Sequence, residues 1–370
     1  MTSEQPVPSA DGQFQLSRST IFPFVGSRAT WSQEHLLSIF ATIVAGLALV
    51  AVPFPGIKLN SNAEINEAWQ VYAIIALYIA FLVNYYINQM CGRAKPGWLQ
   101  ALVGLFTFLM LGGVLWSLWY ALFYSVIPAA QWQKSSYAVV RLAGWWFGTG
   151  LCEEGFKAWP LLLLALLGGG LAGIGHHTKG RSGKLSGFLR RHIALCEPLD
   201  GIVLGVASGA GFFIKETLAQ YVPGAMKDVK WAGAQAFDGL VLLLGRGLPD
   251  IAEHSAWCGL FGYFIGLSVL RPGLAIALVP LGWFTAAALH AGWDGIGSIT
   301  NNGIVLLAFW VFVGLLSYAL LAGAIFRARD ISPRLAAKSA AAAAPQAVGS
   351  AVALTAAAVP AAAFEAPDGD

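Results

Sequence analysis

Long apolar runs separated by short polar segments dominate the chain. Crossing the hydrocarbon core of a bilayer takes about 20 consecutive apolar residues in a helix, and about eight runs approach or exceed that length. The pattern therefore predicts an all-α fold: a polytopic membrane helix bundle of about eight transmembrane helices. The third and fourth runs are the longest, and we expect them to tilt or to extend past the bilayer. The runs cover residues 36–54, 69–89, 98–127, 145–174, 199–219, 252–271, 273–294 and 303–326.

Two of the connecting segments have features of their own. Arg271-Pro272 separates two runs. A proline disfavours helical conformation at the residue before it, so a helix boundary is expected there. Residues 222–251 are expected to form a long extracytoplasmic loop, in which the apolar stretch 240–244 re-enters the bilayer or lies in its interface.

The composition supports a membrane protein and excludes two other classes. The chain is 57% hydrophobic and only 11% charged, whereas soluble domains carry about 25% charged residues. With a net charge of +3 and no basic stripe with interleaved aromatics, a nucleic-acid partner is not expected. The four cysteines show no CxxC spacing, which argues against a disulfide framework or a zinc knuckle.

The basic residues predict the orientation of the chain in the membrane. Five lie between residues 179 and 191 and four between residues 327 and 338. With eight helices both groups fall on the side of the N-terminus, and the positive-inside rule then places both termini in the cytoplasm.

Three parts follow from these patterns. Residues 1–35 are expected to form a polar cytoplasmic N-terminal segment that lacks a secretory signal. Residues 36–326 form the membrane domain, whose motifs are concentrated in residues 145–295. The Ala/Pro-rich residues 335–370 are expected to be a disordered cytoplasmic tail.

Ionisable side chains within the apolar runs are few and clustered. Each costs at least ~2.5–3.5 kcal/mol at the centre of a spanning helix, so they indicate function. Counting ~1.5 Å of rise per residue from the predicted helix ends, four groups of them, on four different runs, fall in the outer half of the bilayer. Two acidic motifs and two histidines at one level predict a water-activating or metal-binding centre. The residues are Glu153, Glu154 and Lys157 in the fourth run, Glu216 in the fifth, His254 in the sixth, and His290 with Asp294 in the seventh.

Structural roles remain open for the same residues. Glu153 and Lys157 share a helix face and would form an ordinary ion pair, and histidines near helix ends can be interfacial. Ser208 lies in a small-residue stretch typical of close helix packing. A Ser208/His254 dyad is a weak alternative, because the Gly and Ser positions are one residue out of register with the rhomboid Gly-x-Ser-Gly. His-Glu-x-x-His and Gly-x-Gly-Asp motifs are absent from the sequence.

Four motifs in order resemble those of a known family. They are Glu-Glu-x-x-Lys at Glu153, Glu154 and Lys157; Phe-x-x-x-Glu at Phe212 and Glu216; Arg246 followed by His-x-x-Trp at His254 and Trp257; and a second His-x-x-Trp at His290, followed by Asp294. The set resembles the PrsW family of bacterial membrane proteases, distant relatives of the CAAX prenyl endopeptidases. Thr217 and Cys258 depart from the family's usual Asn and Thr, which leaves the substrate preference open.

The resemblance implies an intramembrane endopeptidase that depends on a divalent metal, with two chemical versions open. In the first, Glu216, His254 and His290 bind the metal, expected to be zinc, and Glu153 is the general base. In the second, no metal is bound, and Glu153 polarises water while a histidine stabilises the oxyanion. Whether Glu153 or Glu154 is the base is open.

The supporting residues and the partners are also expectations from the resemblance. Phe212 and Trp257 would wall the site, and Arg246 would position the substrate or brace the site. The substrate would be a single-pass membrane protein in the lipid bilayer, cut near the outer face of the bacterial inner membrane. Cleavage of an anti-sigma factor in stress signalling follows only by analogy.

Two other classes of function stay open from the sequence. A transporter or channel could use Glu153, Lys157 and Glu216 as an ion or proton path, although such a path should run through the whole bilayer. A non-catalytic membrane scaffold would keep the fold without the activity.

Overall fold

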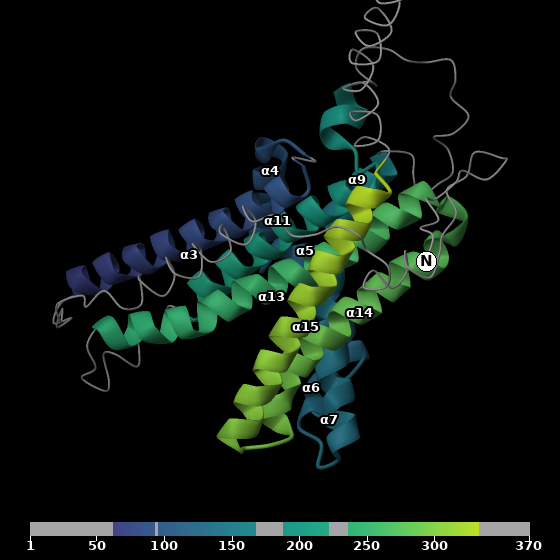
Figure 1. The fold of residues 1–370 in the computed structure, drawn as a ribbon. Helices are drawn as coiled ribbons and strands as arrows, with labels where there is room; N and C mark the ends of the chain where they lie inside the picture. The colour runs from purple at the N-terminus through teal and green to yellow at the C-terminus, as the bar shows by residue number, and fades with distance from the viewer. Residues whose placement is uncertain (1–61, 93–94, 168–187, 222–235, 333–370) are drawn as a thin grey trace, which may run out of the picture. The chain divides into compact units, whose positions relative to one another are not determined.

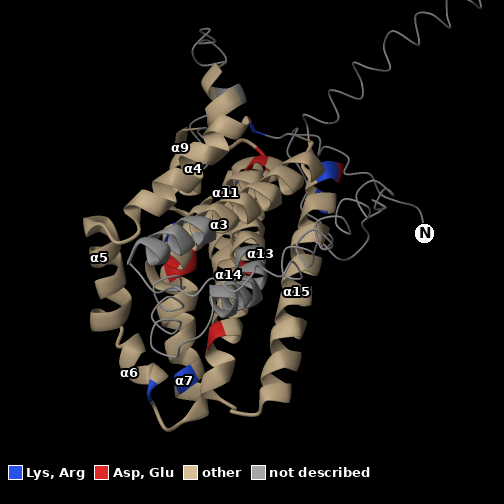
Figure 2. Ribbon diagram, turned by 90° about the vertical axis from the view of Figure 1, so that its left-hand side faces the viewer, with Lys and Arg blue, Asp and Glu red and all other residues tan. Residues whose placement is uncertain are grey.

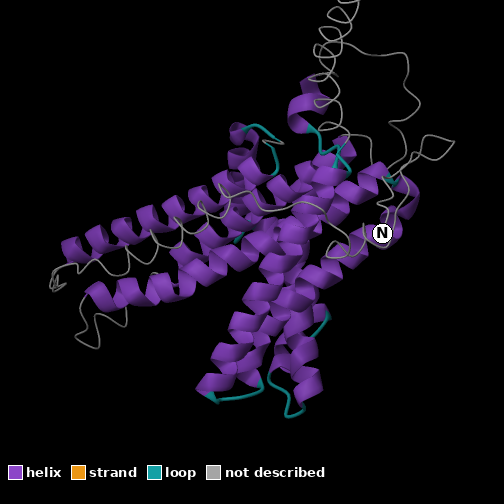
Figure 3. Ribbon diagram, viewed as in Figure 1, coloured by secondary structure: helices purple, strands orange, loops and turns teal. Residues whose placement is uncertain are grey.

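The structure is a computed structural model that describes residues 62–92, 95–167, 188–221 and 236–332. Every regular element in these ranges is a helix, and Figure 3 shows no strand among them, which confirms the all-α prediction. The described helices belong to one compact unit that ends at Asp330. The predicted segment 1–35, the apolar run 36–54 and the tail 335–370 lie outside the described residues, so those expectations remain predictions.

The element order places several short and π-type helices among the long ones, and Figure 1 shows how the labelled α-helices are arranged. The helices are α3 (Asn62–Met90), α4 (Gly97–Met110), α5 (Val114–Ala121), η1 (Leu122–Val126), α6 (Ala129–Gln133), α7 (Ala138–Trp145), η2 (Trp146–Glu153), α8 (Glu154–Lys157), α9 (Trp159–Leu167), η3 (Leu189–Ile193), α11 (Pro198–Glu216), η4 (Thr217–Tyr221), α13 (Ala236–Leu270), η5 (Pro272–Leu274), α14 (Ala275–Gly295), η6 (Ile296–Ser298) and α15 (Gly303–Asp330).

Four of the described segments are long and apolar enough to cross a membrane, and a bent pair would make a fifth. The protein is therefore polytopic, but the predicted number of eight spans is not confirmed within the described residues. Figure 2 shows how few acidic and basic residues these helices carry. The four segments are Ala73–Met90, Pro198–Gln220, Pro272–Ser298 and Gly303–Asp330.

Large apolar side chains are exposed along the outer faces of these helices. On α15, Leu307, Val311 and Leu315 follow one another at helical spacing with more than half of each side chain's surface exposed. An apolar face of this extent suits contact with lipid rather than with water. The exposed faces therefore agree with the polytopic membrane assignment.

The apolar run 98–127 is not the single helix, tilted or extending past the bilayer, that the sequence predicted. It is divided into α4 and a second helical segment made of α5 and η1, and the axes of these two segments differ in direction by 67°. The bend falls at Leu111–Gly113, where Gly112 has a φ of 90°. A side chain at this φ would be strained, so the glycine permits the sharp change of direction.

The apolar run 145–174 contains one irregular turn, at Ala158, and here the cause is a proline. Pro160 has no amide hydrogen to donate to the carbonyl of Phe156, so helical bonding is interrupted between α8 and α9. The hydroxyl of Ser208 on α11 donates to the carbonyl oxygen of Lys157 over 2.6 Å and secures the interrupted turn. The described part of the run is therefore helical except at Ala158, and residues 168–174 lie outside the described residues.

A π-helix, η2, leads directly into the two adjacent glutamates. Two tryptophans donate their indole N–H groups to carbonyls at its end: Trp119 to Cys152 over 2.6 Å and Trp283 to Leu151 over 2.9 Å. Both indole rings would collide with any side chain at position 155, with the nearest ring atoms 2.8 Å from a Cβ built there. Gly155 therefore lets the two tryptophans hold the turn that presents Glu153 and Glu154. Wide turns of this type often lie at functional sites.

Helix α13 begins much earlier than the sequence predicted. It starts at Ala236, so the second half of the expected loop 222–251 is helical and the apolar stretch 240–244 is part of α13. His254 consequently lies in the middle of a long helix and not in a first turn. The predicted boundary at Arg271-Pro272 is confirmed, because α13 ends at Leu270 and η5 begins at Pro272.

Helix α11 is the centre of the fold, and its glycines allow close packing. Its residues 198–213 are all buried, and it packs mainly against α13 and α4. A Cβ at Gly205 or Gly209 would meet the backbone of Cys258 or His254 on α13, and a Cβ at Gly211 would meet Gly104 on α4. This small-residue face brings the backbone of α11 against the part of α13 that carries His254.

We predict that Gly205→Ala destabilises the protein although alanine favours helix over glycine. The new Cβ would lie 2.7 Å from the carbonyl carbon of Cys258, so α11 and α13 would have to separate. Such overpacking costs about 1–3 kcal/mol. The measurement is the thermal unfolding midpoint of the protein in lipid. Gly273→Ala is the matched control, because nothing lies within 4 Å of a Cβ at that position. Equal midpoints for both variants would contradict the packing described here.

Candidate active site

Side chains from five helices converge on one buried polar centre, and these are the ionisable residues that the sequence singled out. Glu153 ends η2, Glu154 and Lys157 belong to α8, Glu216 ends α11, His254 lies in α13, and His290 and Asp294 lie near the end of α14. Arg246 lies in α13, about two turns before His254.

Glu154 is completely buried, and three donors contact its carboxylate. Oε1 accepts hydrogen bonds from Lys157 Nζ and from His290 Nδ1, each over 2.8 Å. Oε2 accepts one from the thiol of Cys258 over 3.3 Å. A carboxylate with this many donors is held in place as an anion and has little capacity left to take a proton from water.

Glu153, the adjacent carboxylate, has different surroundings. Its side chain is 15% exposed, and its Oε2 lies 3.6 Å from Lys157 Nζ and 3.7 Å from His290 Nε2. Both distances exceed hydrogen-bond length, and this oxygen accepts no hydrogen bond from the residues that the structure describes. Glu153 therefore offers an oxygen that is close to two cationic or imidazole nitrogens and still able to bind a ligand or a proton.

Lys157, His254 and Glu216 form a hydrogen-bonded row. Lys157 Nζ lies 2.8 Å from His254 Nδ1, and His254 Nε2 lies 3.2 Å from Glu216 Oε2. An ammonium group only donates, so His254 Nδ1 is the acceptor in the first contact. Glu216 only accepts when ionised, so His254 Nε2 carries the hydrogen that it receives. The row fixes the tautomer and the orientation of the His254 ring.

His290 is contacted by carboxylates at both of its ring nitrogens. Nδ1 donates to Glu154 over 2.8 Å, and Nε2 lies 3.3 Å from Oδ2 of Asp294, one helical turn further along α14. Trp257 stacks on the imidazole, with ring centroids 4.5 Å apart, and its indole donates to Ser317 on α15 over 2.9 Å. Helix α15 therefore helps to fix the His290 ring through Trp257.

The two aromatic residues expected to wall the site do contact its polar groups. The ring of Phe212 lies 4.0 Å from Lys157 Nζ and 5.4 Å from the ring of His254. Trp257 covers His290, as described above. Both side chains are buried, so they exclude water from that part of the centre and strengthen its electrostatic interactions.

Several supporting residues were not identified from the sequence. Ser208 was expected to pack helices, with a Ser208/His254 dyad as the weaker alternative; its hydroxyl bonds the Lys157 carbonyl and lies 2.7 Å from Thr107 Oγ1 on α4. Because Ser208 donates to a carbonyl, this contact gives no support to a Ser208/His254 dyad. Cys258 was noted only as a departure from the family pattern, yet it bonds Glu154. A polar residue inside an apolar helix was the available signal in both cases.

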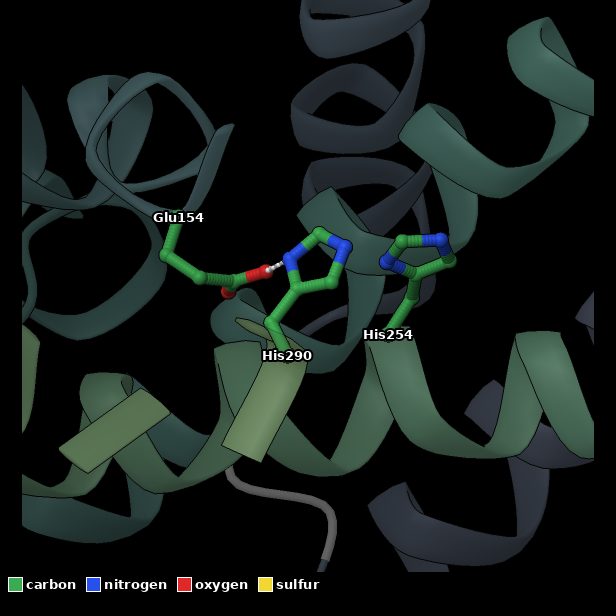
Figure 4. A group of neighbouring side chains, drawn as sticks. All are labelled: Glu154, His254 and His290. Atoms are coloured by element: carbon green, nitrogen blue, oxygen red, sulfur yellow. Dashed lines mark hydrogen bonds and ion pairs between the residues drawn. The ribbon is translucent and has the colours of Figure 1, made fainter. Parts of the chain in front are cut away.

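One group of side chains has the composition of a metal site. Ligand atoms of Glu154, His254 and His290 all lie within 4.8 Å of one another, and Figure 4 shows the three side chains beside one another, with His290 drawn between the other two. Two imidazoles and one carboxylate are a common ligand set of catalytic zinc, with one position left for water. Glu216, predicted from the resemblance to be a ligand, is outside this group, and its Oε2 lies 3.2 Å from His254 Nε2, so its role as a ligand stays a prediction.

The surroundings also fit a divalent cation. Four carboxylates, Glu153, Glu154, Glu216 and Asp294, contact the two imidazoles or Lys157, and Lys157 is the one lysine in these contacts. The buried Oε2 of Glu153, without a hydrogen bond to the described residues, is a further oxygen facing this excess of negative charge. A divalent ion held by Glu154, His254 and His290 would balance most of that charge.

Comparison with known proteins agrees with the geometry. A family model described as PrsW family intramembrane metalloprotease matches residues 99–321, which is more than half of the chain and includes every residue of the polar centre. No curated protein and no solved structure matches the chain. The extent of this match, together with the membrane-spanning helices, shows that the chain belongs to the PrsW family of intramembrane metalloproteases and is a metal-dependent membrane peptidase.

Proposed function

We propose that the protein is an endopeptidase that hydrolyses peptide bonds of single-pass membrane proteins, with Glu153 as the general base. The observation that carries this proposal is the contrast between the two adjacent carboxylates. Glu154 is fully buried and bonded to three donors, whereas Glu153 is partly exposed and keeps one buried oxygen without a hydrogen bond to the described residues. A general base needs an oxygen that can accept a proton from water.

Glu154, His254 and His290 would hold the divalent metal, which we propose to be zinc. When bound, zinc makes water more acidic and polarises a carbonyl group, which are the two effects that peptide hydrolysis requires. Glu153 would take the proton from water and pass it to the leaving amine. The ammonium group of Lys157, which is close to both glutamates, would stabilise the negative charge that develops on the oxygen of the reacting carbonyl.

Glu216 and Asp294 would act through the histidines. Each carboxylate lies within 3.3 Å of the Nε2 atom of one imidazole, Glu216 at His254 and Asp294 at His290. Carboxylates in this position fix the ring orientation and raise the basicity of a ligating histidine. Glu216, which the sequence analysis assigned as a ligand, is therefore proposed as the orienting partner of His254.

The membrane setting of the reaction is also a proposal. It rests on the sequence, which favours about eight spans in the bacterial inner membrane, both termini in the cytoplasm and the polar centre in the outer half of the bilayer. A substrate would then be cut near the outer leaflet. Release of a stress response by cleavage of an anti-sigma factor is proposed from the family resemblance alone.

The arrangement of charges gives less support to a transporter. A second buried ion pair, Lys95 with Asp200 at 3.2 Å, lies at the opposite end of α11 from Glu216. Between them, the α11 residues from Gly201 to Ile214 carry no ionisable side chain. A proton path along α11 would need groups that bridge this stretch.

We predict that Glu153→Gln lowers cleavage by about 10²–10⁴-fold, because glutamine cannot accept the proton, and leaves metal binding unchanged. Glu154→Gln should instead weaken metal binding, because it removes the carboxylate at the centre of the donor group. The measurements are cleavage of a panel of single-pass membrane proteins by purified protein in lipid, and metal content by mass spectrometry. Asp330→Asn, at the end of α15, is the control. Full activity of Glu153→Gln would refute its role as the base.

A second prediction concerns the identity of the metal. Removal of divalent ions by a chelator should abolish cleavage in the same assay, and zinc added in slight excess over the chelator should restore it. Magnesium should not restore cleavage, because it prefers oxygen ligands in an octahedral arrangement. Cleavage that persists after complete removal of metal would favour the metal-free glutamate mechanism instead.

A further inference from the structure

The ammonium group of Lys157 lies among the atoms that would hold the metal. Its Nζ is 2.8 Å from Glu154 Oε1 and 2.8 Å from His254 Nδ1. These two atoms belong to residues of the proposed ligand set, whose ligand atoms lie within 4.8 Å of one another. A zinc ion sits about 2.0–2.2 Å from nitrogen and oxygen ligands, so an ion between Glu154 and His254 would compete with Nζ for the same small volume.

The lone pair of His254 is engaged by this lysine. Nδ1 accepts from Lys157, while Nε2 donates to Glu216, so neither nitrogen has a lone pair directed at another ligand. Metal binding by His254 therefore requires that one of these contacts is given up. The contact with Lys157 is the one that repulsion between two cations would break.

Lys157 is held in this position by more than its ion pairs. Its side chain is completely buried, and its ammonium lies 4.0 Å from the centre of the Phe212 ring, a cation–π contact. Its carbonyl oxygen is bonded by Ser208, which fixes the backbone from which the side chain extends. The lysine thus occupies a built cation position that faces Glu153 and Glu154.

We propose that Lys157 and the divalent metal are alternative occupants of the centre, and that metal binding displaces the ammonium from His254 and Glu154. This inference rests on the metal site of the proposed function. Lys157 would neutralise the carboxylates while no metal is bound, so that the fold does not depend on the metal. It would also weaken the apparent affinity for the metal, because every binding event has to break the lysine contacts.

The test is zinc affinity, measured by competition with a chromogenic chelator on the full-length protein in lipid nanodiscs. Lys157→Met removes the charge and keeps a side chain of similar length, and Lys157→Gln is the second neutral variant in case methionine prevents folding. Both should bind zinc at least about tenfold more tightly than wild type, because the competing cation is gone. Lys157→Arg keeps the charge and should not gain affinity. Lys215→Met, which removes a lysine beside the Phe108 ring, is the matched control and should match wild type.

Thermal unfolding gives a second measurement that does not depend on activity. Without zinc, Lys157→Met should unfold at a lower temperature than wild type, since its carboxylates lose their cation. Addition of zinc should raise the unfolding midpoint of Lys157→Met by more than it raises that of wild type. Zinc affinity that is equal to or weaker than wild type in both neutral variants would overturn the exchange and leave the metal site intact. Failure of wild type and all variants to bind zinc would overturn the metal site and the exchange together.

Discussion

The fold is organised around the buried carboxylate of Glu154, whose cation in this structure is the ammonium group of Lys157. Two charges removed from water within an apolar helix are costly unless each has several close partners. α8 supplies both charges, and the partners have to come from other helices: His290 from α14, and His254 with Cys258 from α13. The packing of α13 and α14 against α8 is what brings those partners within hydrogen-bond distance of the two charges.

These contacts require the helices to approach one another closely. Gly205 and Gly209 let α11 approach the backbone of α13 at Cys258 and His254. Trp119 and Trp283 hold the π-turn that precedes Glu154, and Gly155 gives their rings room. Each of these contacts lies outside the polar centre, yet each determines where its side chains meet.

The location of the centre could be predicted from the sequence, because charged side chains are costly inside a membrane and are therefore rare in apolar runs. Ionisable residues inside apolar runs usually have a functional role. The predicted residues whose side chains are described lie in contact with one another. The hydropathy windows missed the bend and the irregular turn, because a window average does not register Gly112-Gly113 or the missing amide hydrogen of Pro160, although both were present in the sequence as signals. The start of α13 was missed because polar residues within residues 236–251 suggested a loop.

The separate roles of the two glutamates were likewise beyond the sequence. Adjacent residues on a helix point about 100° apart, but the π-turn of η2 changes the direction in which each one points. Only the three-dimensional contacts distinguish a carboxylate bonded to three donors from one with an oxygen still available. Neighbouring carboxylates acquire different chemistry through their surroundings in the same way at other hydrolytic sites.

The identity of the metal ligands can be measured by X-ray absorption spectroscopy of the zinc-loaded protein in lipid. We expect a shell of nitrogen and oxygen ligands at about 2.0–2.2 Å that includes two imidazoles and no sulfur. A His290→Ala protein should lose one imidazole from that shell. A sulfur ligand at about 2.3 Å, which Cys258 beside Glu154 would supply, or a shell without imidazole would show that Glu154, His254 and His290 are not the ligands.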